Sequence, residues 1–502
     1  MSEVHGPVPP ITIEAGSLEG GDYRPTRHEL APQADAPSGF VDRLSSACTM
    51  VDDLPALAES GRDWWPLAMQ WALKGRVPGL PIAVAKPASA SEVADVLRLC
   101  NESRVPVTAA GGRSGVCGAS VPVHGGVVLD LTSMHGIVGV DDESLTVDVL
   151  PGTFGDTFED TLRADHGLTC GHWPQSIAIS TVGGWLACRG AGQLSTRYGK
   201  IEDIVVALEV AMADGTVVHT GGAPRAAAGP DLTQLFVGSE GTLGIITEAR
   251  LKAHPIPTGK RTGAWGYESF DAGLDACRRI LRRGATPAVL RLYDAGEANR
   301  SYETGDRAVL LVMDEADPAL VDATFTIIES ETGDAERLDD GLVDRWWGHR
   351  NEVSALEALT RRGYVVDTME IAGPWSSLPG IYERAVEALM SVPGTMSATA
   401  HQSHAYTDGA CLYFTFAAKP EADERERYYV AAWDAAQRAV LDNGGALSHH
   451  HGVGLNRSRF MADALGKGLD VLASIKGALD PNGILNPGKL GLPDPFGEVR
   501  WP

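Results

Sequence analysis

Three glycine-rich segments lie between residues 107 and 246 of this 502-residue chain, at 107–118, 171–184 and 236–246. Glycine accepts backbone conformations that other residues avoid, and consecutive backbone N–H groups in such turns can surround phosphate oxygens. The first segment contains neither a Gly-Lys-Ser/Thr P-loop nor a GxGxxG fingerprint, so the Walker and Rossmann interpretations both fail there. A single glycine-rich turn can be a tight turn and nothing more. Three in one domain favour a large, flat, phosphate-bearing ligand that runs through the whole domain.

The residues around the first segment have the pattern of a strand-helix-strand unit. Residues 82–85 form a short apolar run, and Ser89 and Glu92 then have the spacing of a helix capping box. Apolar residues follow at helical spacing, and residues 105–110 predict a second strand. Further strands are expected at 126–131 and 145–150. Residues 79–256 are therefore predicted to form one domain of mixed helices and strands.

The sequence changes character after residue 257. Segments with a helical period, at 270–283, 378–390 and 429–443, alternate with strand-like segments at 308–313 and 410–416. This alternation predicts a second α+β domain over residues 257–440, followed by a C-terminal segment, 441–502. Residues 1–78 are expected to form an N-terminal arm and a helical extension, which Trp64, Trp65 and Trp71 anchor to the main body.

Charge argues against a nucleic-acid partner. The chain has 42 Lys and Arg residues against 66 Asp and Glu residues, a formal net charge of −24. Such a protein repels a phosphate backbone at long range, although a local basic pocket for a small anion remains compatible with this charge.

The cysteines and the apolar segments predict the compartment. Seven cysteines are widely spread with no CxxC pair, which disfavours a zinc knuckle or a disulfide framework and fits a reducing compartment. The first residues lack the pattern of a secretory signal, and no stretch of about 18 apolar residues predicts a transmembrane segment. A cytoplasmic protein is expected.

In their order along the chain, the glycine-rich segments resemble the FAD domain of the vanillyl-alcohol oxidase / p-cresol methylhydroxylase flavoproteins, over about residues 60–490. The resemblance implies a two-domain α+β FAD-binding fold with an α+β substrate or cap domain. It also implies that the C-terminal segment returns to the FAD domain. In several relatives a histidine in the first loop bonds covalently to the flavin, but Arg113 occupies that position here, so non-covalent FAD is predicted.

The resemblance also implies which residues contact the cofactor. Residues 108–114 would hold the FAD pyrophosphate, and three later stretches would line its isoalloxazine, ribityl and adenine portions. The cofactor-binding positions implied in this way are Thr108, Ala109, Ala110, Gly111, Gly112, Arg113, Ser114, His172, Gln175, Ser176, Ile177, Ala178, Ile179, Ser180, Thr181, Cys188, Arg189, Gly190, Ala191, Glu240, Gly241, Thr242, Leu243, Gly244, Ile245 and Ile246.

The second half is most similar to the alkyldihydroxyacetonephosphate synthase branch, through residues 409–416 and the run Ser-His-His-His-Gly-Val-Gly at 448–454. Residues 287–292 and 367–370 match as well. The active-site positions that this similarity implies are His172, Arg291, Thr368, Tyr413, His449, His450 and His451.

These residue types suit an oxidation. A neutral imidazole can take a proton from an alcohol near the flavin, because its pKa lies near neutrality. Tyr413 could polarise or protonate an oxygen of the reacting group, and the guanidinium fork of Arg291 suits a carboxylate or phosphate. In an extended segment His449 and His451 would face one way and His450 the other, so that only one or two of them reach a substrate.

Metal ligation is the alternative use of the histidines, through His401, His404 and the triplet. Some flavin dehydrogenases of 2-hydroxy acids hold a metal through a His-x7-His pattern and a Glu-His-Gly segment. Here His450 occupies the glutamate position and the second histidine of the earlier pattern is missing, so no metal is expected.

Two functions remain open. In the synthase pattern two cations occupy the positions of Leu356 and Leu455, and their loss weakens the case for a phosphorylated substrate. The favoured function is an FAD-dependent oxidoreductase that acts on an alcohol, with a 2-hydroxy acid as the expected substrate. It would need a small-molecule substrate and an electron acceptor. The alternative is a redox-neutral exchange of an acyl for an alkyl group, as in ether-lipid synthesis; a flavoprotein without catalysis is disfavoured by the retained Tyr413 and histidines. Whether the chain forms a homodimer stays open.

Overall fold

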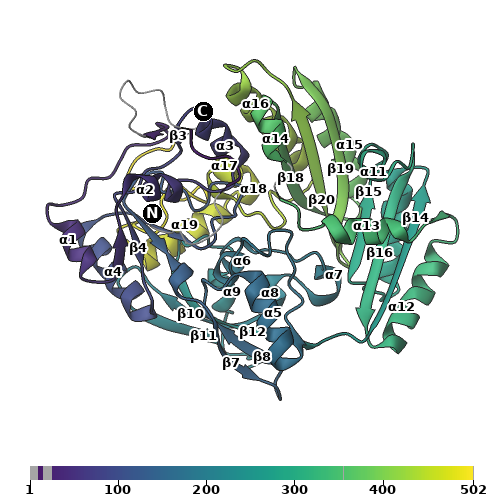
Figure 1. Cartoon of the computed structure of the whole chain (residues 1–502), viewed down its shortest axis with the longest axis horizontal. Helices are drawn as coiled ribbons and strands as arrows, with labels where there is room; N and C mark the ends of the chain where they lie inside the picture. The colour runs from purple at the N-terminus through teal and green to yellow at the C-terminus, as the bar shows by residue number, and fades with distance from the viewer. Residues whose placement is uncertain (1–8, 15–24, 354–355, 501–502) are drawn as a thin grey trace.

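The computed structural model describes residues 9–14, 25–353 and 356–500, and its strands form sheets in two separate regions of the molecule (Figure 1). One region holds a four-stranded and a five-stranded sheet from the first half of the chain. The other holds a seven-stranded sheet from residues 259–418. The two-domain α+β fold predicted from the sequence is confirmed.

The predicted strand-helix-strand unit forms the start of the first region. Strands β4 (Ala83–Lys86), β6 (Val127–Asp130) and β5 (Val107–Ala110) are parallel neighbours, and β2 (Thr49–Val51) pairs antiparallel with β4. Helix α4 (Ala90–Ser103) begins where the Ser89 hydroxyl accepts a hydrogen bond from the Glu92 N–H. Its buried face is the predicted apolar one, so local sequence decides this unit.

The five-stranded sheet has the order β11-β10-β12-β8-β7 and is antiparallel throughout. Its strands, in chain order, are β7 (Ile137–Asp141), β8 (Thr146–Val149), β10 (Val205–Ala211), β11 (Val217–Gly221) and β12 (Ile245–Lys252). Helices α5 (Gly155–His166) and α6 (Val182–Cys188) pack on it through a shared apolar core. The three glycine-rich segments therefore connect elements of this first region.

The seven-stranded sheet has the order β17-β14-β16-β15-β19-β20-β18 and is antiparallel. Its strands are β14 (Gly259–Tyr267), β15 (Val289–Tyr293), β16 (Ala308–Ala316), β17 (Glu336–Leu338), β18 (Val365–Pro374), β19 (Thr395–Ala405) and β20 (Gly409–Ala418). Four helices share an apolar core with one face of the sheet: α10 (Phe270–Arg282), α12 (Pro318–Glu331), α15 (Leu378–Ser391) and α16 (Arg425–Asp442). Alternation along the strands turns a second set of residues to the opposite face. Val309 and Leu311 of β16 join another apolar cluster there, whereas Arg291 of β15 and Tyr413 of β20 are polar.

Both chain ends contribute to the first region (Figure 1). After α16 the chain passes through the histidine triplet, then α17 (Gly454–Arg457), α18 (Met461–Leu465) and α19 (Gly468–Leu479). It returns beside β5, where Leu485 forms a parallel bridge with Val107. Near the other end, α3 (Pro66–Ala72) begins after Trp65, whose indole N–H donates to the Tyr429 hydroxyl of α16 at 2.9 Å. The division at residues 78, 256 and 440 stays a proposal.

No helix of the described ranges is both long enough and apolar enough to cross a membrane.

Candidate active site

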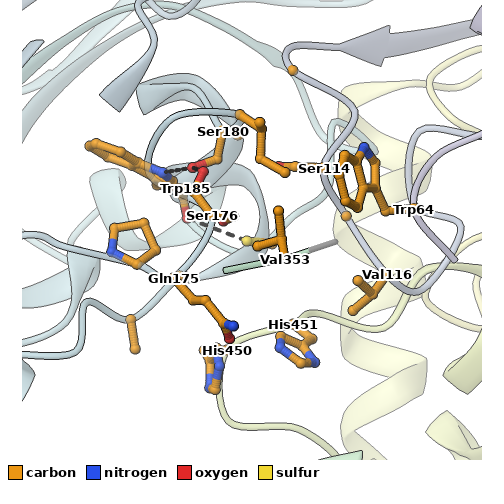
Figure 2. A pocket seen from close by; sticks show the side chains of 18 of the residues that line it. Trp64, Ser114, Val116, Gln175, Ser176, Ser180, Trp185, Val353, His450 and His451 are labelled. Carbon is orange, nitrogen blue, oxygen red and sulfur yellow. Dashed lines mark hydrogen bonds between the residues drawn. The ribbon is translucent and has the colours of Figure 1, made fainter. Parts of the chain in front are cut away.

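A cavity of about 790 Å³ is lined by the glycine-rich loops, by residues of the seven-stranded sheet, and by His450 and His451 of the histidine triplet (Figure 2). Its wall also includes Trp64 of the N-terminal extension. The positions predicted from the resemblance that line it are Ala109, Ala110, Gly111, Gly112, Arg113, Ser114, Gln175, Ser176, Ile179, Ser180, Thr181, Cys188, Gly190, Ala191, Glu240, Gly241, Gly244, Ile245, Ile246, Arg291, Thr368, Tyr413, His450 and His451.

The first two glycine-rich loops pack against each other so closely that side chains are excluded. A Cβ on Gly111 would lie 2.2 Å from the Thr181 hydroxyl oxygen, and one on Gly112 would lie 2.1 Å from the Ile179 carbonyl oxygen. Glycine is therefore required at both positions because of space. The backbone of the two loops then forms the cavity surface directly, which suits close approach by a phosphate-bearing ligand.

Arg113 is the buried cation of the first loop. Its backbone has a φ of 52°, and its Nη1 lies 3.6 Å from an Asp130 carboxylate oxygen. Among the described residues this buried Nη1 has no hydrogen-bond partner. A buried guanidinium nitrogen without a partner is costly, and a phosphate oxygen in the cavity would satisfy it. The loops therefore fit a dinucleotide that carries a pyrophosphate.

The second loop is stiffened by its own hydroxyl groups. The Trp185 indole N–H donates to the Ser180 hydroxyl at 2.7 Å, and that hydroxyl donates to the Ser176 carbonyl at 2.9 Å (Figure 2). The Thr181 hydroxyl accepts from the Gly184 N–H and caps α6. The loop is thus held in place before any ligand contacts it.

In the third loop, Glu240 holds the C-terminal segment. Its carboxylate is buried and accepts hydrogen bonds from the backbone N–H groups of Val453 and Gly454. Its backbone φ is 51°, next to glycines of positive φ at 238 and 241. The carboxylate is thereby used by the protein itself, although the residue lines the cavity.

Several predicted positions do not line the cavity. His172 is fully buried and lies against the Trp185 ring, with ring centroids 4.6 Å apart. Burial lowers the pKa of His172 to about 3, so this ring stays neutral behind the loop. The positions outside the cavity lining are Thr108, His172, Ile177, Ala178, Arg189, Thr242, Leu243 and His449.

Strand register brings the cap residues together. Tyr293 of β15 is paired with His401 of β19, and His401 is in turn paired with Tyr413 of β20. Tyr413 is also paired with Glu370 of β18. Residues paired across neighbouring strands project from the same face of a sheet. Arg291 lies two residues before Tyr293 and shares that face, which is the one turned to the cavity.

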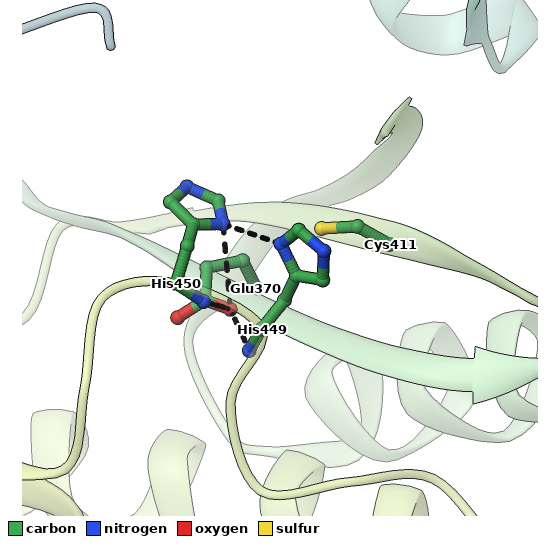
Figure 3. Close-up of side chains that lie close together, drawn as sticks. All are labelled: Glu370, Cys411, His449 and His450. Carbon is green, nitrogen blue, oxygen red and sulfur yellow. Dashed lines mark hydrogen bonds and ion pairs between the residues drawn. The ribbon is translucent and has the colours of Figure 1, made fainter. Parts of the chain in front are cut away.

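Glu370 is the anchor of the histidine triplet. Its buried carboxylate accepts hydrogen bonds from the backbone N–H groups of His449 and His450 (3.1 Å) (Figure 3). It also accepts one from the backbone N–H of His451 at 3.0 Å. It also accepts from the Ser448 hydroxyl at 2.8 Å and from the Arg457 guanidinium at 2.7 Å. Although burial raises it, the guanidinium and the neighbouring imidazoles lower the pKa of Glu370 to about 2.

The triplet is therefore bent around a carboxylate and is not an extended strand. The expected alternation, with His449 and His451 on one side, is wrong because three successive N–H groups converge on Glu370. Both His450 and His451 line the cavity; that one or two histidines reach a substrate stays a prediction. His449 turns instead toward Tyr406, whose hydroxyl lies 3.0 Å from its Nε2.

A chain of hydrogen bonds leads from His450 to His404, which also lines the cavity. The Nδ1 atoms of His450 and His449 lie 2.9 Å apart (Figure 3). From His449 the chain continues through the Tyr406 and Ser195 hydroxyls, 3.2 Å apart, to Nδ1 of His404, 2.8 Å from Ser195. Burial lowers the pKa of His450 well below its ordinary value of 6.5, and lowers that of His451 to about 4. Both rings are neutral near pH 7.

The same side chains offer a candidate metal site. Ligand atoms of Glu370, Cys411, His449 and His450 lie within 4.8 Å of one another. However, both oxygens of Glu370 already accept hydrogen bonds, including one from a cationic guanidinium. His401, considered above as a ligand, has its Nε2 occupied by the Arg291 guanidinium at 2.6 Å. These contacts show that the Glu370 carboxylate and Nε2 of His401 are already used by the protein; the absence of a metal stays a prediction.

Sequence reasoning missed Ser195, Tyr406 and Arg457, and it gave Glu370 no role. Each reaches the histidines from a distant part of the chain, through a contact that no local pattern signals. One signal was available in the sequence: Arg457 lies in the mostly apolar segment after the triplet, and a buried arginine needs a carboxylate partner.

Comparison with known proteins agrees with this geometry. A family model described as an FAD binding domain matches residues 81–221, and one described as the C-terminal domain of FAD linked oxidases matches residues 256–490. The FAD-linked oxidoreductase YgcU of Escherichia coli O157:H7 is 32% identical over 82% of this chain and 89% of its own length. The glycolate oxidase subunit GlcD of Bacillus subtilis has the same identity and coverage. The alkyldihydroxyacetonephosphate synthase of Dictyostelium discoideum is 29% identical over 83% of this chain and 74% of its own length.

Solved structures give the same result. An alkyldihydroxyacetonephosphate synthase superposes with a TM-score of 0.76 and 25% identity, covering 96% of this chain and 90% of that one. A p-cresol methylhydroxylase superposes with a TM-score of 0.75 over 92% of this chain and 99% of that one, at 18% identity, which shows a shared fold. The resemblance noted in the sequence is confirmed. This chain belongs to the FAD-linked oxidase family, with the p-cresol methylhydroxylase type of fold and FAD as its cofactor.

Proposed function

We propose that this enzyme oxidises a small 2-hydroxy acid, with the substrate carboxylate on Arg291 and the hydroxyl group on His450. The observation that carries this proposal is the position of Arg291, which lines the cavity beside the triplet without a carboxylate ion-pair partner among the described residues. In a chain of net charge −24 such a cation is available to an anionic ligand.

FAD would accept the hydride from the carbon that bears the hydroxyl group. The predicted contacts of residues 108–114 and 175–181 would hold it. These loops combine close backbone packing with an Arg113 nitrogen that makes no hydrogen bond within the described residues. That the flavin is bound non-covalently stays a prediction from the arginine at position 113. The electron acceptor would be oxygen or another oxidant.

His450 is the proposed base. Its ring is neutral near pH 7 and it lines the cavity, so its Nε2 can take the hydroxyl proton of the substrate. The His450 imidazolium formed would be stabilised by the Glu370 carboxylate, 3.8 Å from its Nδ1. Tyr413 is the proposed donor to the substrate oxygen, because its hydroxyl group lies between Thr368 (3.2 Å) and His451 (3.4 Å).

Two positions favour this proposal over the synthase reaction, one in the cavity wall and one buried in the core. Leu356 lines the cavity, and Leu455 is buried and packs against Gly118, where the synthase pattern has cations. An apolar side chain offers no charge-assisted hydrogen bond to a phosphate.

One observation favours the second candidate, a redox-neutral exchange of an acyl for an alkyl group. Arg345 and Arg350 also line the cavity, and within the described part of the chain neither pairs with a carboxylate. They would supply positive charge for a phosphate from α13 (Gly341–His349) and the residue after it, in place of the two missing cations. The enzyme would then form dihydroxyacetone-phosphate ethers with no net change in the flavin.

The test mixes purified FAD-loaded protein with candidate substrates without oxygen. Lasting loss of the long-wavelength flavin absorbance with glycolate, D-lactate or another 2-hydroxy acid supports the oxidation. Turnover of acyl-dihydroxyacetone phosphate plus a fatty alcohol, with unchanged flavin absorbance, would instead establish the exchange.

Replacing the base gives the first mutational prediction. His450→Ala should reduce turnover at least about 100-fold, the usual contribution of a general base, while the FAD content stays that of the unchanged protein. His219→Gln is the matched control, because the His219 side chain is exposed on β11. Turnover that survives in His450→Ala would disprove the base assignment.

A further inference from the structure

The guanidinium of Arg291 is held by two neutral groups. Its Nε donates to the Tyr293 hydroxyl at 2.6 Å, and its Nη2 donates to Nε2 of His401 at 2.6 Å. An arginine side chain can only donate hydrogen bonds, so Nε2 of His401 must carry a lone pair and accept. The proton of a neutral His401 ring is then on Nδ1.

That proton is directed at a carboxylate. Nδ1 of His401 lies 2.9 Å from Oε1 of Glu297, in the first turn of α11 (Ala295–Tyr302). The other oxygen of Glu297, Oε2, is buried and makes no hydrogen bond among the described residues. Glu297 thus has spare acceptor capacity close to a cation from which it is separated by one imidazole ring.

The sheet fixes the plane of this ring. His401 is paired with Tyr293 on one side and with Tyr413 on the other, and its ring stacks on Tyr413 with centroids 4.9 Å apart and planes 15° apart. Arg300 of α11, which also interacts electrostatically with Glu297, donates a hydrogen bond to the Thr399 hydroxyl at 3.1 Å. The ring therefore stays between the guanidinium of Arg291 and the carboxylate of Glu297.

We propose that His401 is a positioning residue that keeps Arg291 apart from Glu297, so that the guanidinium faces the cavity and can bind a substrate carboxylate. This inference rests on the proposed function of Arg291. Without the ring, Arg291 and Glu297 would form a direct two-bond ion pair, the preferred geometry for these groups. The guanidinium would then be neutralised by the protein itself, and the substrate would lose its anion-binding group.

The experiment measures binding of oxalate, a dianion that resembles a 2-hydroxy acid, to the FAD-loaded protein by isothermal titration calorimetry. His401→Leu removes the acceptor and should weaken oxalate binding about 10-fold. His401→Gln retains an acceptor that cannot be protonated and should retain most of the affinity. In turnover with the best hydroxy acid, His401→Leu should raise KM with little change in kcat.

A double variant shows whether His401 acts by keeping Arg291 away from Glu297 or only supports the local structure. Glu297→Gln in the His401→Leu background removes the competing carboxylate and should restore most of the oxalate affinity. If His401→Gln is as weak as His401→Leu, or if the double variant is no better than His401→Leu alone, the inference is wrong. Circular dichroism and FAD content show which variants fold.

Arg291→Met tests the proposed substrate-binding role of Arg291 separately from the positioning role of His401. Unchanged oxalate binding in this variant would overturn the proposed role of Arg291 and so the proposed function. Weakened binding in Arg291→Met together with normal binding in His401→Leu would overturn only the role of His401. His219→Gln again serves as the histidine control, because the His219 side chain is exposed on a strand of the other region.

Discussion

His450 and His451 are neutral because burial disfavours the charged form of an imidazole. The consequence is a pH profile unlike that of an exposed histidine. A base with a lowered pKa remains unprotonated, and therefore active, as the pH falls through 6.5. It becomes protonated and inactive only below its own pKa. We expect kcat/KM to stay level from about pH 8 down to about pH 6 and to decline at more acidic values.

This profile is measured with the free enzyme at saturating acceptor, between pH 4.5 and 8, with circular dichroism at each pH as a control for acid unfolding. A decline centred on pH 6.5 would show that the essential base titrates as an exposed histidine, contrary to the burial of His450. His451→Gln should shift the profile less than any substitution at His450, since only the latter is the proposed proton acceptor.

At this scale the sequence predicted residue types better than residue partners. Arg291, Thr368 and Tyr413 line the cavity as expected. His172 does not, because it is fully buried and packs against the Trp185 ring, a contact that depends on tertiary packing. The partners of Arg291 follow from the register of β15 and β19, which are joined by more than 100 residues of chain, so no local pattern contains that information.

The glycine-rich loops give a prediction at the scale of elements. Gly112→Ala places a Cβ 2.1 Å from the Ile179 carbonyl oxygen, so the first two loops must separate. We expect purified Gly112→Ala protein to contain much less FAD, measured as the flavin-to-protein absorbance ratio, while far-UV circular dichroism is unchanged.

Gly380→Ala is the matched control, because a Cβ there meets nothing within 4 Å and alanine favours the helix α15 by about 1 kcal/mol. It should keep full FAD content. Equal FAD content in both variants would mean that close packing of the loops is not what holds the cofactor.

Elements with a local signal were predicted well, and those shaped by distant contacts were not. The cap and the apolar face of helix α4 are both encoded within the adjacent residues 89–103. Helix α16 begins at Arg425, four residues before the apolar period suggested. The histidine triplet has no local signal for its bend, because the bend is imposed by Glu370 on a strand some 80 residues earlier.

The buried ion pair of Arg457 and Glu370 gives a prediction at the scale of the whole molecule, since it joins the C-terminal segment to the seven-stranded sheet. Both side chains are fully buried. Arg457→Met leaves Glu370 as an uncompensated buried anion and should lower the free energy of unfolding by about 3–5 kcal/mol, measured by urea unfolding.

The double variant Glu370→Gln/Arg457→Met removes both charges and should recover part of that loss. A single variant that unfolds at the same urea concentration as the unchanged protein would refute the structural role of this pair. Activity is a poor readout here, because both variants also disturb the triplet.

Two carboxylates accept hydrogen bonds from neighbouring parts of the same short loop. Glu370 of the seven-stranded sheet binds residues 449–451, and Glu240 of the first region binds residues 453–454. The loop is therefore hydrogen-bonded to both regions of the enzyme within six residues. If the two regions separated to admit a substrate, the histidine loop could not stay bound to both of them. Such an opening would break the hydrogen bonds of either Glu370 or Glu240, or would displace His450. We therefore expect the substrate to enter the cavity without separation of the two regions.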